Sequence, residues 1–306
     1  MVEILKTELC GIELKNPIVL ASGVLGLNKE TLMIAQKGGA AALTIKSITL
    51  EPREGHETPN VAFFECGMLN AFGYNNIGLC KAKQEFSDLS CFKVPVFGSC
   101  TAGSPEEFAN LVKELDKIDF KAFELPVSCP HTPGHGLLSG QNERRFVEKV
   151  IKKCRKKTKK PIFLKINAGL PNFAEVSLCA QKAGADAIVC SNTLPGMIID
   201  INARSPVLSF KKGGVSGPAI RPMVIKAVYE LYETIKIPII GVGGISRGEH
   251  VIEYLMAGAS AVGIATGVLQ RGPSVFKKCS NEVARWMKKH NYKNISELIG
   301  VAHERV

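Results

Sequence analysis

The sequence contains no Cys-x-x-Cys pair and no cluster of cysteines with iron–sulfur spacing, although it has ten cysteines. This absence excludes a cysteine-bound iron–sulfur centre within the chain. Several cysteines fall inside predicted strands or helices, where a free cysteine behaves as a small hydrophobic residue. The cysteines therefore indicate a reducing compartment, and we expect a cytoplasmic protein.

Long hydrophobic runs are also missing. No stretch reaches the roughly 18 uncharged apolar residues of a membrane-spanning helix, and residues 1–17 lack the apolar core of a signal peptide. We therefore expect a protein that is neither exported nor inserted in a membrane. No His, Cys and Asp residues have metal-ligand spacing, and no serine–histidine pair is apparent, so the sequence predicts no metal site.

Acidic residues are fewer than basic ones, and the 306 residues carry a formal net charge of +11. The excess lies mainly in helix-like segments such as 151–160, which has no interleaved aromatic residues for stacking on bases. This segment is either a solvated helix end or a contact with a specific partner. The charge does not predict nucleic-acid binding. The proportions of 45% hydrophobic and 22% charged residues are those of a globular protein with a large core.

Eight short hydrophobic segments recur along the chain and are predicted to be strands. Most are continuous hydrophobic runs, which is typical of parallel strands that are covered on both faces. The predicted strands are 18–22, 42–47, 95–99, 122–128, 161–166, 187–192, 238–243 and 261–266. Amphipathic segments between them predict helices at 29–37, 104–117, 142–156, 172–183, 219–234, 247–256 and 273–289.

This alternation predicts an α/β fold, a (β/α)8 TIM barrel formed by residues 1–306 as one domain. An open doubly wound sheet is the alternative, but no G-x-G-x-x-G motif follows the first predicted strand. Two connections, 50–94 and 192–218, are longer than ordinary loops. We expect them to be insertions at the carboxyl face of the barrel that form a lid over a ligand.

Polar and small residues end the predicted strands, where they would share the carboxyl mouth of the barrel. Lys46 and Lys165 would otherwise be surface residues, but together they predict a site for an anion or an electron-rich ring. Glycines after the seventh strand either make a simple turn or, with the small residues of the eighth, form a phosphate site. A phosphate-bearing cofactor is the expected ligand.

Cys129 follows the fourth predicted strand and precedes a loop rich in proline and glycine, residues 130–136. A thiol at the exit of a parallel strand is a candidate catalytic group, whereas the same residue in a core would be structural. His131 and His135 are either surface residues of this loop or groups that tune the thiol and bind a ligand.

Taken together, these residues resemble the dihydroorotate dehydrogenase family, most closely the flavin-bearing catalytic subunit of its class 1B enzymes. The similarity runs over nearly the whole chain. It is carried by segments 15–23, 46–53, 67–73 with Asn76, 128–130, 192–197, 213–220 and 240–245. The resemblance implies an FMN-dependent oxidoreductase of pyrimidine biosynthesis that acts on a CH–CH bond and oxidises dihydroorotate to orotate.

The resemblance also assigns residues. Cys129 matches the catalytic base, and Lys165 matches the lysine that balances negative charge on reduced flavin. The flavin-contacting positions are matched by Ala21, Ser22, Lys46, Ser47, Lys165, Gly217, Gly243, Gly244, Ala265 and Thr266. The positions around the pyrimidine are matched by Lys46, Met68, Leu69, Asn70, Asn192 and Thr193.

Class 1B members pass electrons to NAD through a separate subunit that holds FAD and a [2Fe–2S] cluster. Membrane-bound members carry an amino-terminal helical extension and use a serine base, whereas this chain begins at the barrel and has Cys129. The resemblance therefore implies such an electron-transfer partner, in a homodimer or a heterotetramer.

Pro126 departs from the family, which usually has an asparagine there that hydrogen-bonds the pyrimidine. The missing hydrogen bond to a buried polar group costs about 1–3 kcal/mol. His131 replaces a second asparagine, and a Ser-Cys-Pro-His sequence is similar to dihydropyrimidine dehydrogenases. Two alternatives therefore stand beside dihydroorotate oxidation: an FMN-dependent enzyme for another dihydropyrimidine-like substrate, and a barrel that binds flavin or a partner without turnover.

Overall fold

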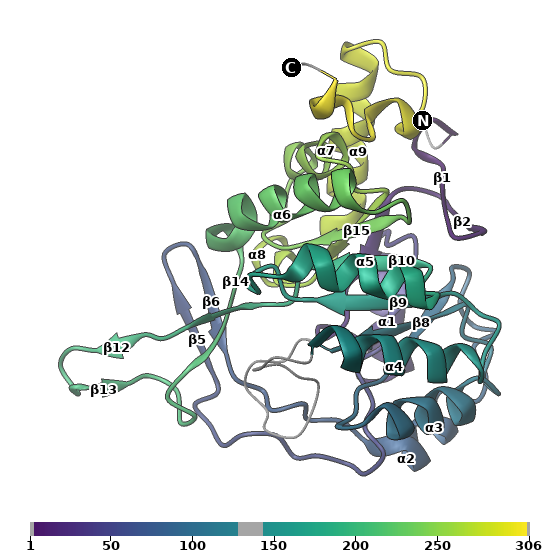
Figure 1. The fold of residues 1–306 in the computed structure, drawn as a ribbon. Helices are drawn as coiled ribbons and strands as arrows, with labels where there is room; N and C mark the ends of the chain where they lie inside the picture. Colours follow the sequence, from purple (N-terminus) through teal and green to yellow (C-terminus); the bar gives the residue numbers. More distant parts are fainter. Residues whose placement is uncertain (1–2, 128–142, 305–306) are drawn as a thin grey trace.

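Eight parallel strands close into a barrel in the computed structural model, which describes residues 3–127 and 143–304 (Figure 1). Each strand lies within one of the predicted segments, and the predicted (β/α)8 barrel is confirmed. In order around the barrel the strands are β3 (Ile18–Leu20), β4 (Leu43–Thr44), β7 (Val96–Ser99), β8 (Ala122–Pro126), β9 (Ile162–Ile166), β10 (Ala187–Cys190), β15 (Ile239–Val242) and β16 (Ala261–Ile264).

Helices pack around the barrel, and every predicted helix is present with its ends shifted by at most two residues. These are α1 (Lys29–Lys37), α3 (Pro105–Leu115), α4 (Glu143–Arg155), α5 (Phe173–Ala183), α6 (Arg221–Thr234), α7 (Gly248–Met256) and α9 (Val275–Lys289). The predicted cap of α3 is formed, because Ser104 Oγ accepts the backbone N–H of Glu107 at 3.2 Å. The described residues also form two α-helices that were not predicted, α2 (Gly78–Glu85) and α8 (Gly267–Arg271).

Neighbouring residues of a barrel strand point alternately into the barrel and outward toward the helices. In β3, Ile18 and Leu20 belong to the hydrophobic cluster between strands and helices, whereas Val19 belongs to the interior cluster. Inside the barrel the rings of Phe97 and Phe163 meet edge to face, with centroids 5.3 Å apart. Both faces of the strands are buried, which explains their continuous hydrophobic sequences.

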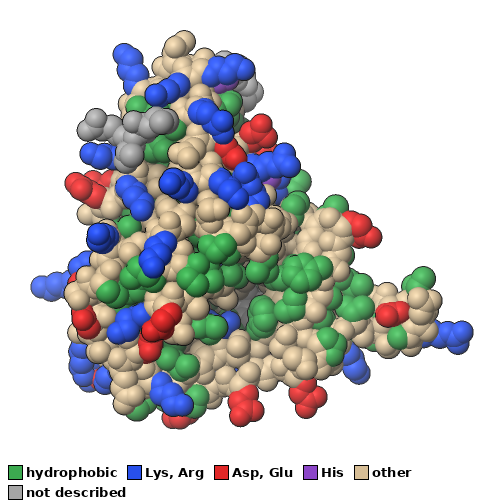
Figure 2. Space-filling model, turned by 180° about the vertical axis from the view of Figure 1, so that it is seen from behind, with side chains coloured by type: hydrophobic (Ala, Val, Ile, Leu, Met, Phe, Trp, Pro, Cys, Tyr) green, Lys and Arg blue, Asp and Glu red, His purple; other side chains and the backbone are tan. Residues whose placement is uncertain are grey.

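A second sheet stands outside the barrel and is built from the two long insertions. It is antiparallel, and its strand order is β11 (Leu194–Gly196), β14 (Gly213–Ser216), β6 (Gly67–Asn70) and β5 (Val61–Phe64). The hairpin of β12 (Ile199–Asp200) and β13 (Ser205–Pro206) projects beyond it as an arm (Figures 1 and 2). The sequence predicted these insertions as loops and did not predict their strands.

The amino end of the barrel is covered by the hairpin of β1 (Thr7–Leu9) and β2 (Ile12–Leu14). Leu9 and Leu14 join the interior cluster together with the first residues of three barrel strands, Ala122, Ala187 and Ala261. No helix in the described ranges is both long and apolar enough to span a membrane.

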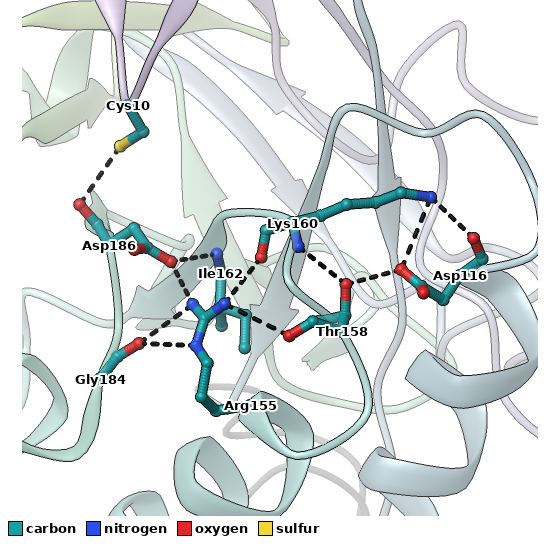
Figure 3. A network of polar contacts seen from close by, with 8 residues as sticks. All are labelled: Cys10, Asp116, Arg155, Thr158, Lys160, Ile162, Gly184 and Asp186. Atoms are coloured by element: carbon teal, nitrogen blue, oxygen red, sulfur yellow. Dashed lines mark hydrogen bonds and ion pairs between the residues drawn. The ribbon is translucent and has the colours of Figure 1, made fainter.

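A polar network at the start of β9 and β10 ties the loops of this amino end together (Figure 3). Arg155 donates to the carbonyl oxygens of Gly184 at 3.1 Å and Lys160 at 3.0 Å, and it pairs with Asp186. Asp186 also accepts the backbone N–H of Ile162 at 2.7 Å. Every one of these contacts satisfies a group at a loop, so we assign the network to stability.

Asp186→Ala is expected to lower the free energy of unfolding by about 1–3 kcal/mol, because it leaves the backbone N–H of Ile162 without its acceptor and the Arg155 guanidinium without its counter-charge. Chemical denaturation measures this change. Asp119→Ala is the control, because the Asp119 side chain is 73% exposed and forms a surface ion pair with Lys121. It should stay within about 0.5 kcal/mol of the wild type. Equal stabilities for the two variants would contradict the assignment.

Candidate active site

A cavity opens at the carboxyl ends of the barrel strands, between the barrel and the antiparallel sheet. The residues predicted to contact flavin all line it, namely Ala21, Ser22, Lys46, Ser47, Lys165, Gly217, Gly243, Gly244, Ala265 and Thr266. Five of the six residues predicted around the pyrimidine line it as well, namely Lys46, Met68, Asn70, Asn192 and Thr193. The fold therefore brings both predicted groups into one space.

Strand alternation explains why polar side chains face this cavity. Phe163 in β9 belongs to the interior cluster, so Lys165, two residues on, points the same way but one layer nearer the mouth. Phe97 and Ser99 in β7 stand in the same relation, as do Ala122 and Glu124 in β8. The barrel therefore carries a polar layer directly above its apolar interior.

Hydrogen bonds join this polar layer across neighbouring strands. The hydroxyl groups of Ser22 and Ser47 are 3.3 Å apart, and those of Ser47 and Ser99 are 2.9 Å apart. Ser99 Oγ lies 3.5 Å from Glu124 Oε1, which Lys165 Nζ approaches to 3.4 Å. The line of contacts thus runs from Ser22 at the end of β3 to Lys165 on β9.

Lys46 and Lys165 differ in what surrounds them. Lys165 is paired with Glu124, and the two side chains are only 7% and 5% exposed. Lys46 has no carboxylate partner among the described residues, and its Nζ lies 5.1 Å from the centroid of the Phe72 ring. Burial lowers the pKa of Lys46 to about 8. An anion entering the cavity would restore a partner to this lysine.

Backbone N–H groups gather at the ends of β15 and β16. Within the described ranges, Gly243, Gly244, Thr266 and Gly267 donate no backbone hydrogen bond, although all four line the cavity. Gly244 has a φ of +67°, and a Cβ atom there would meet Gly217 O at 2.8 Å. The turn therefore needs glycine, and it leaves donors that suit the oxygen atoms of a phosphate.

The antiparallel sheet supplies the opposite wall of the cavity. Asn70 donates its side-chain amide to Gly214 O at 3.1 Å, and Thr266 Oγ1 donates to Ser216 Oγ at 2.8 Å. The second contact ties the sheet to the barrel. Leu69 is the predicted pyrimidine residue that does not line the cavity, because its fully buried side chain packs with Leu208 on the other face of β6.

The segment after β10 is held by its own polar contacts. Asn192 Oδ1 accepts the backbone N–H of Thr193 at 2.8 Å. Asn167 donates its side-chain amide to Thr193 O at 2.9 Å, and its Oδ1 accepts the N–H of Gly169 at 2.8 Å. Asn167 does not line the cavity but holds this segment beside it, and it was not predicted. Its signal in the sequence was a polar side chain directly after a predicted strand.

Pro126 also lines the cavity, at the last position of β8. Its ring presents no hydrogen-bond donor or acceptor to a ligand. Cys129, His131 and His135 lie outside the described residues. Among the residues that are described, no group of three His, Cys, Asp or Glu side chains is arranged to hold a metal ion.

The residues present fit a flavin cofactor that carries a phosphate group. Backbone donors without a partner in the described part of the chain stand at one end of the cavity, and the two lysines come from other strands. Apolar side chains such as Val24, Ile220 and Val242 lie along its walls. A phosphate needs the donors, and a flat ring system needs apolar walls. Figure 2 shows hydrophobic side chains gathered around a hollow on the face next to the projecting arm.

Comparison with known proteins places this chain in a family. The model of the dihydroorotate dehydrogenase family matches residues 4–287. A protein of Methanocaldococcus jannaschii named dihydroorotate dehydrogenase B (NAD(+)), catalytic subunit, is 43% identical over 305 residues, which cover 98% of each chain. Proteins of the same name from Pyrococcus furiosus and Thermoplasma volcanium are 41% and 39% identical, over 98% of this chain and 99% of theirs. The predicted resemblance is confirmed, and the chain belongs to the dihydroorotate dehydrogenase family.

Proposed function

We propose that this protein oxidises dihydroorotate to orotate, with FMN bound in the cavity at the carboxyl face of the barrel. One observation carries the proposal: the residues that match the family's flavin positions come from separate strands and line a single cavity. When bound, FMN supplies an acceptor for the hydride that leaves the substrate. Gly217, Gly243, Gly244, Ala265 and Thr266 would hold its phosphate end.

Lys46 and the asparagine side chains would orient the substrate. Dihydroorotate carries a carboxylate, and Lys46 is a half-buried cation with no carboxylate partner among the described residues. A charge-assisted hydrogen bond between them would be stronger than a neutral one. The side-chain amides of Asn70 and Asn192 contain both hydrogen-bond donors and acceptors, which can bind the polar groups of the substrate ring.

Cys129 is proposed as the general base that removes a proton from the carbon next to the one that loses the hydride. The loss of a proton and a hydride from neighbouring carbons leaves a carbon–carbon double bond. A thiolate is the reactive form, and two lysines in the cavity would favour it by lowering the thiol's pKa.

Pro126 is the observation that favours a second candidate substrate. The cavity lacks at this position the amide that would bind a pyrimidine carbonyl or N–H. A dihydropyrimidine-like molecule without the corresponding polar group would lose less binding free energy when proline replaces asparagine here. The second candidate is therefore an FMN-dependent oxidoreductase of such a molecule.

An electron-transfer partner with FAD and a [2Fe–2S] cluster is proposed as the route from flavin to NAD, in the cytoplasm. The relatives are named as catalytic subunits of NAD-dependent enzymes. Three hydrophobic side chains are exposed on the projecting arm and just before it, namely Met197, Ile199 and Ile201, with exposed fractions of 52%, 50% and 82%. Clustered exposed hydrophobic side chains are typical of contact surfaces, which supports assembly into a homodimer or heterotetramer.

Dihydroorotate is expected to bleach the yellow colour of the purified, FMN-loaded protein under anaerobic conditions, whereas dihydrouracil is not. The measurement is the flavin absorbance after mixing with each compound. Bleaching by dihydrouracil alone would support the second candidate and overturn the first. Bleaching by neither would contradict dihydroorotate oxidation and would point to a different substrate or to a barrel that binds flavin without turnover.

The affinity for orotate is expected to be constant below pH 8 and to fall up to tenfold per pH unit above it. The reason is that the Lys46 amine, with a pKa of about 8 in the ligand-free protein, loses its proton as the pH rises. Titrations of orotate between about pH 6.5 and 9 measure this. Lys46→Gln controls for ionisation of the ligand itself, and should bind weakly without this pH dependence. The same slope in both proteins would contradict the role of Lys46.

Cys129→Ala is expected to keep FMN bound and to slow flavin reduction by dihydroorotate by about 100- to 10,000-fold, the usual loss for a general base. Stopped-flow absorbance measures the rate. Cys91→Ala is the control, because Cys91 is an exposed free cysteine outside the cavity lining. Reduction at the wild-type rate in Cys129→Ala would exclude this thiol as the base.

A further inference from the structure

Glu124 is a buried carboxylic acid to which the proposed reaction assigns no role. Its side chain is 5% exposed, and it lies in the polar layer beneath the cavity without lining the cavity. Burying a carboxylate is costly unless it is paired and hydrogen-bonded. The groups that pair with Glu124 therefore indicate what it does.

Its partners come from the two neighbouring strands. Glu124 is in register with Ser99 of β7, and Lys165 of β9 is in register with Pro126, one inward position nearer the mouth. Ser99 and Lys165 both contact the same oxygen atom: Glu124 Oε1 lies 3.5 Å from Ser99 Oγ and 3.4 Å from Lys165 Nζ. Lys165 thus has the cavity on one side and a carboxylate on the other.

The serine hydroxyls extend this arrangement toward the cavity. If Ser99 donates its proton to Glu124, its hydroxyl has none left for Ser47, so Ser47 must donate to Ser99 at 2.9 Å. For the same reason Ser22 must donate to Ser47 at 3.3 Å. The carboxylate therefore sets the direction of each hydrogen bond in this series. As a result, the hydroxyl groups of Ser22 and Ser47, which border the cavity, can only accept a hydrogen bond from a ligand.

We propose that Glu124 is a positioning residue of the flavin site, which fixes Lys165 beneath the cofactor and offsets part of its positive charge. The inference rests on the proposed FMN site. Lys46 provides the contrast, because it lines the same cavity without a carboxylate partner in the described part of the chain. The two lysines therefore differ in effective charge. Lys46 keeps its whole positive charge for the substrate, whereas Glu124 offsets part of the positive charge of Lys165 beside the flavin.

The offset has a measurable consequence for the cofactor. Reduced flavin carries more negative charge than oxidised flavin, and a nearby carboxylate opposes that increase. Glu124→Gln removes the charge but keeps an oxygen that can accept from Lys165 Nζ. We expect this variant to favour reduced over oxidised FMN by about tenfold relative to the wild type, which raises the midpoint potential by about 30 mV for a two-electron couple.

The experiment is a redox titration of FMN-loaded wild type, Glu124→Gln and Glu124→Asp, followed by absorbance. The aspartate variant keeps the charge and should stay closer to the wild-type potential than Glu124→Gln does. Glu114→Gln is the matched control, because Glu114 also pairs with lysines, Lys83 at 2.8 Å and Lys117 at 2.9 Å, but lies on α3 away from the cavity. Its potential should equal that of the wild type.

Glu124→Gln leaves Lys165 without its counter-charge, so this variant can fail to fold. The same comparison is then made between Lys165→Gln and the double variant Lys165→Gln/Glu124→Gln, in which neither residue is charged. The double variant should have the more positive potential. An unchanged or more negative potential on removing the Glu124 charge, in whichever pair is measured, overturns the inference. Failure of the wild type to bind FMN would instead contradict the proposed function.

Discussion

The ion pair of Lys165 and Glu124 stands where the apolar interior of the barrel gives way to its open mouth. Below it, Phe97 and Phe163 fill the barrel, and above it lies the cavity. A charged pair survives here only because each partner satisfies the other and Ser99 adds a further contact. Closure of the sheet supplies the geometry, because it brings the side chains of β7, β8 and β9 to one level. The other residues of the site are arranged around this layer of polar side chains.

The barrel could be predicted from the sequence because its strands are covered on both faces and are therefore hydrophobic throughout. The helices were equally accessible, since local signals such as Ser104 mark where they begin. The antiparallel sheet had no comparable signal. Its strand β14 is Gly213–Ser216, rich in glycine, and it pairs with β6, which precedes it by more than a hundred residues. Strands of this kind depend on long-range pairing, which sequence patterns do not show.

Much of the candidate site followed from one rule, that residues at the carboxyl ends of parallel strands meet at the mouth. This rule predicted both lysines and the glycines that follow β15, Gly243 and Gly244. It missed Glu124, which lies within the strand and was counted as part of a hydrophobic run. Leu69 came from the resemblance alone; alternation along β6 separates it from Met68 and Asn70, which face the cavity. Cys129 lies outside the described residues, so its place in the site stays a prediction.

The cavity is walled by two structures with different origins in the chain. The barrel contributes the charged floor, and the sheet made from the two insertions contributes Met68 and Asn70 and is fastened to the barrel by the hydroxyl contact of Thr266 with Ser216. Insertions at a barrel mouth vary more freely than the strands beneath them. Proteins with this architecture can therefore evolve to bind a different heterocycle through changes in the antiparallel sheet, while the charged residues of the barrel continue to set the redox properties of the cofactor.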